Sequence, residues 1–113
     1  MAVTVDPLVH AKHAEATQTT QYTSGTGTRT IVDKMTATNT SGAAAALSVN
    51  LVPSAGSPAA SNLVVSAKAL APGECYTLPE IVGQVLGPGD SLSTLASAAG
   101  SIVIRVSGRK VTT

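Results

Sequence analysis

The chain has 113 residues, of which 43% are hydrophobic, 12% are charged and 2% are aromatic, and its formal net charge is +1. This length suits a single domain. The near balance of charges argues against a nucleic-acid-binding surface, which needs a basic stripe or patch. Phe and Trp are absent, so the core has to be built from Ala, Val, Leu and Ile. Because such side chains bury less area than aromatic ones, we expect contacts between copies to contribute stability.

The sequence shows no targeting or membrane-spanning segment. Its first ten residues, MAVTVDPLVH, lack the charged start and the long apolar run of a signal peptide. No stretch approaches the ~18 apolar residues of a membrane span. The single cysteine, Cys75, excludes an internal disulfide and a cysteine-only metal site. We therefore expect no membrane partner, and a protein that is made in the cytoplasm and stays there at least at first.

Residues 1–16 differ from the rest of the chain and are predicted to form an N-terminal arm. One alternative is a short helix with Asp6 as its N-cap and Pro7 in its first turn, and the other is an extended segment. A helix this short is not stable alone, so we expect the arm to dock on a neighbouring subunit. The predicted subunit-contact residues are Leu8, Val9, His10 and His13.

Residues 17–113 are predicted to form one β-sandwich domain of short strands separated by turns. The polar and β-branched residues 17–24 are typical of a first strand. Residues 26–40 form the next one, in which Asp33 lies on the apolar side and indicates a bulge or partial exposure. The residues expected on the apolar face of this strand are Ile31, Met35 and Ala37.

The stretch NTSGAAAALSVNLVP, residues 39–53, combines a helical propensity with a strand pattern. Four consecutive alanines favour a helix. However, Leu47, Val49 and Leu51 alternate with polar residues at period two. An Asn-Thr-Ser-Gly turn precedes the run, and Pro53 follows it. We therefore predict a strand that begins within the alanines and leads into a loop over residues 54–61.

The next segments continue the strand pattern. Residues 61–70 are predicted to form a strand, and the APGE sequence after it is typical of a turn. Residues 75–86 are interrupted by Pro79 and Gly83, which predicts two short pieces or an edge strand. The inward face of the strand over residues 61–70 is expected to carry Leu63, Val65, Ala67 and Ala69.

The last segments complete the predicted domain. The GPGD turn leads into a strand over residues 90–97. The final strand, residues 101–111, is expected to place Ile102, Ile104 and Val106 inward and Arg105 outward. About seven or eight strands at roughly ten-residue spacing are typical of an all-β, antiparallel sandwich or barrel.

The sequence contains no recognisable catalytic, cofactor-binding or metal-binding motif, so we expect no enzymatic activity and no cofactor. His10 and His13 share one face if the arm is helical, but two ligands make an incomplete zinc site. Cys75 has no histidine in the domain body to activate it. Glu74 and Asp90 each follow a Pro-Gly pair and are expected to be turn residues. A carboxylate pair that meets in space is the remaining acid-base alternative.

Three stretches of the chain resemble a known group of proteins. They are QYTSGTGTRTIVDKMTATNTSGAAAALSVNLVPSAG, SNLVVSAKALAPGECYTLPEIVGQVLGPGDSLSTLAS and SIVIRVSGRKV. The matching features are a Thr-rich first strand, the NTS turn with alanines, the SVNLVP strand, two Pro-Gly turns and a short closing strand. Over about residues 18–110, the chain resembles small β-sandwich structural proteins of tailed-bacteriophage virions.

The resemblance implies a jelly-roll-like, non-enzymatic virion protein that decorates or cements the capsid or completes the neck or tail. The implied partners are copies of itself, in a trimer or ring, and other virion proteins such as capsid, portal or tail proteins. The particle would be assembled in the host cytoplasm. The alternative is a carbohydrate-binding module of a phage fibre or tail tip, for which only Tyr22 and Tyr76 offer an aromatic platform. The resemblance supplies no functional residues.

Overall fold

The computed structural model describes residues 2–112, and over this range it contains nine β-strands and one short 3₁₀ helix. The strands are β1 (Ala2–His13), β2 (Thr19–Thr23), β3 (Thr28–Asn39), β4 (Ala45–Val52), β5 (Leu63–Leu70), β6 (Cys75–Tyr76), β7 (Val85–Leu86), β8 (Ser91–Ala96) and β9 (Ile102–Thr112). The helix, η1 (Ala60–Asn62), directly precedes β5. Among the described residues, no helix has the length and apolar character needed to cross a membrane.

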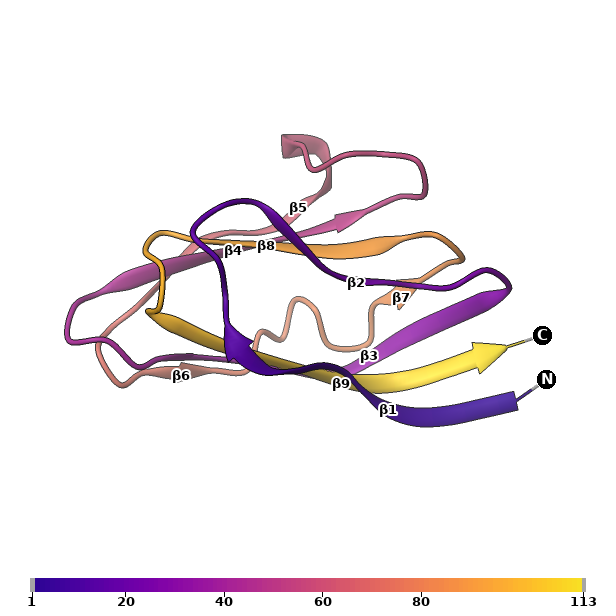
Figure 1. The fold of residues 1–113 in the computed structure, drawn as a ribbon, viewed down its shortest axis with the longest axis horizontal. Coiled ribbons are helices and arrows are strands. Elements are labelled where there is room, and N and C mark those ends of the chain that lie inside the picture. Colours follow the sequence, from indigo (N-terminus) through magenta and orange to yellow (C-terminus); the bar gives the residue numbers. More distant parts are fainter. Residues whose placement is uncertain (1, 113) are drawn as a thin grey trace.

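The strands form two antiparallel sheets that pack face to face (Figure 1). Sheet A has the order β1-β9-β3-β6, with β7 also paired to β3, and sheet B has the order β2-β8-β4-β5. Because β6 and β7 pair with separate parts of β3, they share one strand position. This arrangement, in which most successive strands alternate between the sheets, is that of a jelly roll. The predicted all-β, jelly-roll-like sandwich is confirmed.

The core lies between the two sheets and is aliphatic. On β9 the predicted alternation is confirmed, because Ile102, Ile104 and Val106 are fully buried and Arg105 is exposed. The largest fully buried side chains are Met35, Leu47, Leu70, Leu78, Ile81, Leu86, Leu92, Ile102, Ile104, Val32, Val49 and Val106. Tyr22 and Tyr76 only pack against the edge of this cluster. The core is therefore built without a buried aromatic ring at its centre.

The irregularity predicted at Asp33 is a shift of strand register. The pairing of β3 with β9 shifts between Val32 and Lys34, so Asp33 has no direct partner and points to solvent. As a consequence Val32 is fully buried and Ile31 only half-buried. The expected inward position of Ile31 is therefore wrong, while those of Met35 and Ala37 are confirmed. An extra residue in one strand reverses the facing of the residues before it.

The alanine run enters a strand, as predicted, since Ala45 and Ala46 begin β4. Leu47 and Val49 are fully buried, and Leu51, opposite the buried Leu92 of β8, is half-buried and packs against the core. The preceding turn is built around Asn39, whose side chain is fully buried. Its Nδ2 donates to the carbonyl oxygens of Ala43 and Leu70, each at 2.9 Å. Its Oδ1 accepts from the backbone N–H of Ser41 at 2.9 Å and from the Ser41 hydroxyl at 2.7 Å.

The predicted inward face of β5 is largely wrong. Val65 is buried, but Leu63, Ala67 and Ala69 are exposed, and Leu70 is fully buried instead. β5 slips against β4 at two places: Ala67, which has a positive φ of 46°, lies at one of them, and Leu63 lies beyond the other, between Val49 and Asn50. A single left-handed residue turns the following side chains to the opposite face.

The N-terminal segment is extended, and the short-helix alternative is wrong. Residues Ala2 to Pro7 of β1 pair one by one with Thr112 to Ser107 of β9, and further pairs reach His13 after two register shifts. Ala2 and Thr112 thus lie side by side, and both ends of the described chain meet at one end of the sandwich (Figure 1). Pairing with β9 satisfies the backbone groups on one side of the segment and leaves those on the other side at the edge of sheet A.

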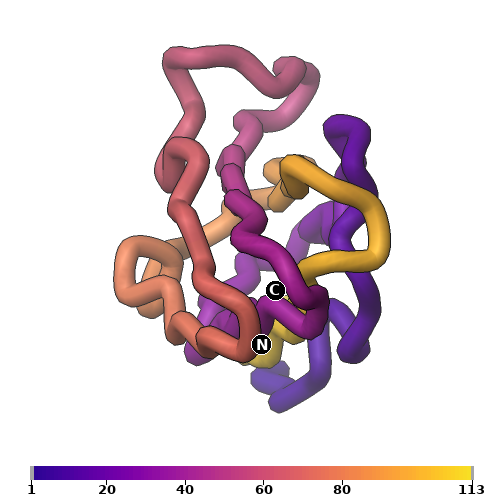
Figure 2. The backbone as a smooth tube through the Cα atoms, turned by 90° about the vertical axis from the view of Figure 1, so that its left-hand side faces the viewer, coloured from indigo at the N-terminus to yellow at the C-terminus, as the bar shows by residue number. Residues whose placement is uncertain are grey.

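The loop between β4 and β5 projects beyond the sandwich (Figure 2). Asn50, a buried residue of β4, holds this loop through its Nδ2, which donates to the Ala59 carbonyl at 3.0 Å and to Asn62 Oδ1 at 2.7 Å. Asn62 in turn donates to the carbonyl of Ser57 at 3.0 Å. The polar residue in the predicted apolar strand therefore anchors a loop whose own residues are mostly exposed.

Candidate interaction surface

The four predicted contact residues of the N-terminal segment have different surroundings. Val9 is 5% exposed and belongs to the core of its own chain, against which Leu8 also packs. His10 and His13 are exposed. The structure does not bring the four together into one outward surface, and their contact with another subunit stays a prediction.

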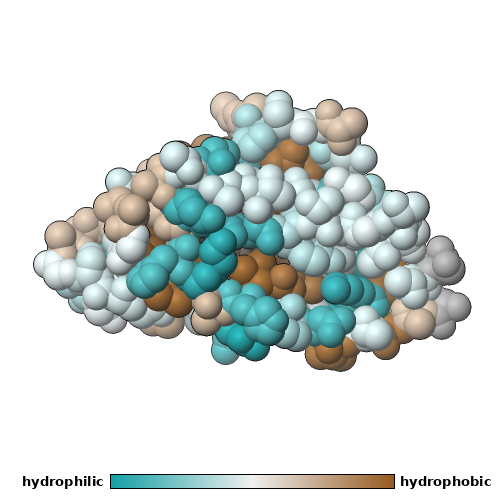
Figure 3. Space-filling model, in the orientation of Figure 1, coloured by the Kyte–Doolittle hydropathy of each residue, from teal (hydrophilic) through white to brown (hydrophobic). Residues whose placement is uncertain are grey.

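The outer face of sheet A carries apolar side chains near both chain ends. In an antiparallel sheet, directly paired residues point to the same face. One row across the sheet joins Val3 on β1 to Val111 on β9 and Arg29 on β3, and the next joins Val5 to Arg109, Ile31 and Val85. We name Val3, Val5, Ile31, Val85 and Val111 the outer valine patch. Apolar surface appears at the lower right of Figure 3, where the first half of β1 lies in Figure 1.

The exposure of this patch is unusual for aliphatic side chains. Val3 is 56% exposed, Val5 77% and Val85 54%, and together they make up three of the five large hydrophobic residues most exposed among those described. Contiguous apolar surface on a soluble domain is typical of a contact site. This patch was not predicted from the sequence, although the alternation of Val3 and Val5 with Thr4 and Asp6 is visible there.

Basic side chains surround the outer valine patch on the same face. Arg109 binds Asp33 through two nitrogens, with Nε at 3.1 Å from both carboxylate oxygens and Nη2 at 3.0 Å from Oδ1. Arg29, Lys34 and Arg105 are exposed on this face as well. Four cations against one carboxylate give the face a positive potential, which disfavours a basic partner and favours a neutral or acidic one.

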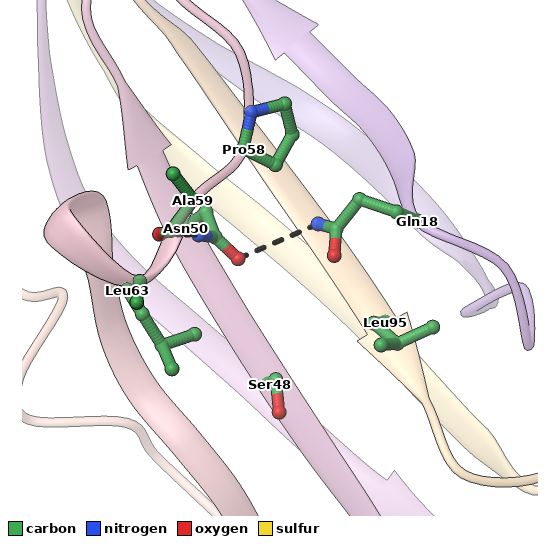
Figure 4. A pocket seen from close by; sticks show the side chains of 8 residues that line it. Gln18, Ser48, Asn50, Pro58, Ala59, Leu63 and Leu95 are labelled. Carbon is green, nitrogen blue, oxygen red and sulfur yellow. Dashed lines mark hydrogen bonds between the residues drawn. The ribbon is translucent and has the colours of Figure 1, made fainter.

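A groove on the outer face of sheet B has a volume of about 430 Å³. Figure 4 shows Gln18, Asn50 and Leu95 on its walls, with Pro58 and Ala59 of the loop above them. Gln18 Nε2 donates to Ser93 Oγ at 2.7 Å and to Asn50 Oδ1 at 3.4 Å. Gln18 Nε2 and the Asn50 side-chain amide are therefore used within the chain, on each other, on Ser93 and on the loop.

The groups with catalytic or metal-binding chemistry lie apart from one another. Cys75 is exposed on β6, and no group of three or more His, Cys, Asp or Glu residues that could hold a metal ion occurs within residues 2–112. Glu74 and Asp90 are turn residues as expected. Glu74 Oε1 accepts from the backbone N–H of Ala71 at 2.8 Å, and the Asp90 carboxylate accepts from those of Ser54 and Gly87, each at 2.9 Å.

The two tyrosines are held within the chain and do not line the groove on sheet B. Tyr22 shares a hydrogen bond with Thr30 Oγ1 at 2.8 Å, and Lys110 lies 5.8 Å from its ring centre. The Tyr76 hydroxyl donates to the Glu80 carboxylate, which raises the pKa of Tyr76 above its ordinary value of 10.0. Their role as sugar platforms remains a prediction.

We expect Glu15 to contribute to stability at neutral pH and to lose that contribution in acid. Gln21 Nε2 donates to its Oε1 at 2.9 Å and Lys12 Nζ to its Oε2 at 3.1 Å, and these bonds lower the pKa of Glu15 below its ordinary value of 4.5. A carboxyl whose pKa is lower in the folded than in the unfolded state stabilises the folded protein at pH values above its unfolded-state pKa. It loses this contribution as the pH falls through its folded-state pKa. Urea unfolding followed by circular dichroism should therefore separate wild type from Glu15→Gln at neutral pH and bring them together well below pH 4.5. A difference that stays the same at both pH values contradicts this.

Comparison with known proteins gives a likeness of fold. No protein-family model matches the chain, and no curated protein matches it. Among solved structures, the chain is similar to a chain in the structure of infectious bursal disease virus Gx strain, with a TM-score of 0.51 and 12% sequence identity. The match covers 98% of this chain, which spans 32% of the length of that chain. At this identity the likeness concerns the jelly-roll fold.

Proposed function

We propose that the protein is a non-enzymatic structural component of a virus particle and that it acts through contacts with other protein chains. The observation that carries this proposal is the outer valine patch, an exposed apolar surface beside an unpaired sheet edge. The jelly-roll fold supports it, because virus capsid domains are a common setting for this fold. The similarity of fold to a chain in a virus structure also supports the proposal of a virus structural protein.

The finer proposal is a tailed-bacteriophage virion protein that decorates or cements the capsid, or completes the neck or tail. It rests on the resemblance of the strands and turns over residues 18–110. Its partners would be further copies of the chain, in a trimer or ring, and a capsid, portal or tail protein. The positive outer face of sheet A favours a partner surface that carries carboxylates.

Purification of particles tests this function. Particles of the phage that encodes the chain should be separated from soluble protein on a density gradient, and their proteins quantified by mass spectrometry. We expect the chain in the particle fraction at a fixed molar ratio to the capsid protein. A chain found only in the soluble fraction would overturn the proposal.

Removal of residues 1–16 does not suit this test, because it also damages the fold. The segment supplies Val9 and Ala14 to the core and is the neighbour of β9 in sheet A. Substitution of exposed residues separates contact from folding. We expect Val5→Lys to weaken incorporation into particles while the unfolding midpoint of the free chain stays close to wild type, because Val5 is 77% exposed. Normal incorporation of this variant would exclude Val5 from the contact.

A further inference from the structure

We propose that the free edge of β1, from Ala2 to Asp6, pairs with the same edge of a second copy of this chain. The two strands run antiparallel about a two-fold axis at Thr4. This inference rests on the proposed function, to which it adds the partner and the contact. Such a contact is isologous and closes at two chains, so a larger ring would assemble from these pairs through another face.

The edges of the two sheets differ in how they are protected against pairing with other chains. Natural sheets protect their edges with bulges, short strands or strong twists, because an open edge pairs with other chains. In sheet B, β2 has a register shift after Thr20, and β5 is broken at Ala67. On the far side of sheet A, β6 and β7 have two residues each. Each of these edges is thus short or irregular.

The edge of β1 lacks such protection over its first half. Ala2 to Pro7 form six consecutive pairs with β9 without a register shift, and no described strand lies on the other side of β1. Shifts appear only after Pro7. Proline cannot donate a ladder hydrogen bond, so Pro7 also marks where pairing with a further strand has to stop. The open segment therefore has a regular register and a defined length.

The side chains of this segment match themselves when the two-fold axis lies at Thr4. With the axis at Thr4, Val3 faces Val5 of the second copy, Thr4 faces Thr4, and Ala2 faces Asp6. Apolar β-branched pairs and Thr–Thr pairs are favourable across antiparallel strands, at roughly 0.2–1 kcal/mol each. An axis at Val5 would place Pro7 opposite Val3, and an axis at Asp6 would place two carboxylates together. The register at Thr4 avoids both.

The same register extends the outer valine patch into the second copy. Val3 and Val5 lie on the outer face of sheet A, next to Val111 and in the rows that reach Ile31 and Val85. Joining two β1 edges makes the five-stranded sheet A of each copy continuous with that of the other. The valines that are 56% and 77% exposed in one chain then pack against each other.

A charge exchange tests both the contact and its register. The solution mass should be measured by light scattering during size exclusion, over a tenfold concentration range. We expect wild type at twice the chain mass of 11.2 kDa.

Three double or single variants test the contact. Val3→Lys with Val5→Lys puts like charges opposite each other and should give single chains. Val3→Lys with Val5→Glu puts Lys opposite Glu and should restore the pair at low salt, with loss at high salt because of screening. Val85→Lys, on the same face but away from β1, is the matched control and should stay paired.

Several outcomes would overturn the inference. These are a wild type that stays at the mass of one chain or has that of three, a Lys-Lys variant that still pairs, and a Lys-Glu variant that behaves like the Lys-Lys one. Circular dichroism checks that each variant is folded. If the lysine variants do not fold, Thr4→Cys in a Cys75→Ser background replaces them.

The cysteine variant reads the register directly. Directly opposed residues of antiparallel strands have Cα atoms about 4.5–5.5 Å apart, within the range that a disulfide spans. With oxidised glutathione as oxidant, Thr4→Cys should form a reducible dimer, and Ser66→Cys on the β5 edge should not. Failure to cross-link overturns the pairing.

The particle assay distinguishes this inference from the proposed function. A chain that does not pair but still joins particles overturns only the pairing. A chain that pairs but is absent from particles overturns only the proposed function.

Discussion

Replacing Asn39 by alanine is expected to lower the free energy of unfolding by about 3 kcal/mol, because partners of a buried amide lose their hydrogen bonds. The side chain is fully buried and uses both donors and its acceptor, on Ala43, Leu70 and Ser41. The carbonyl of Leu70 is itself buried in this contact. Alanine offers none of these bonds, and water reaches only the partners nearer the surface.

Two further variants isolate the cause. Ser41→Ala removes one of the two donors to Asn39 Oδ1 together with the exposed bonds of the Ser41 hydroxyl to the Ala43 backbone, and should cost about 1 kcal/mol or less because water can replace these bonds. Asn39→Asp keeps the acceptor but turns a carboxylate toward two carbonyl oxygens. The free energy of unfolding that Asn39→Asp loses should therefore be greatest at neutral pH and smaller in acid, where the protonated carboxyl can donate a hydrogen bond. Urea unfolding followed by circular dichroism measures all three, and equal losses for Asn39→Ala and Ser41→Ala would contradict the proposed role of the amide.

Gly108→Ala is expected to cost about 3 kcal/mol, toward the upper end of overpacking effects. Gly108 lies in β9 opposite Val32, next to the register shift of β3. A Cβ atom at this position would collide with the backbone carbonyl oxygen of Ile31 and would come within 3.1 Å of Leu8 Cδ1. Backbone cannot move aside as the end of a flexible side chain can, so the β3–β9 pairing has to shift.

Gly42→Ala is the matched control for Gly108. Its added Cβ would meet no atom within 4 Å, and its φ is not in the left-handed region. We expect a change within about 1 kcal/mol, and in the stabilising direction, because alanine restricts the unfolded chain. The midpoints of urea unfolding compare the two variants. Similar midpoints for Gly108→Ala and Gly42→Ala would contradict the close approach of β3 and β9 at this position.

The parts of the fold that followed from the sequence are those in which local pattern and tertiary packing agree. In the last strand, Ile102, Ile104 and Val106 alternate with polar or smaller residues, and the core covers the same face. The charged Asp33 on an apolar face indicated the shift in β3. The alanine run was assigned to a strand because its flanking turn and its period-two pattern outweighed helical propensity.

The remaining parts depended on long-range pairing. Nothing local requires the left-handed conformation of Ala67, which an alanine adopts at a cost and only because the β4–β5 pairing imposes it. β1 contains Pro7 and several residues with weak strand propensity, and its partner is the far end of the chain. The outer valine patch was visible as an alternation, but which face sheet B leaves open is decided only by the assembled sandwich.

The position of β1 next to β9 has a consequence for synthesis of the chain. The first strand pairs with the last, and Ala2 and Thr112 are 110 positions apart. At about 5–20 residues per second, β1 waits roughly 5–20 seconds for its partner to leave the ribosome. During that interval Val3 and Val5 lie on an unpaired segment, and β3 lacks the neighbour that separates it from β1. Sheet A is therefore completed only once β9 has been synthesised, and a nascent chain stalled before β9 lacks the strand that joins β1 to β3.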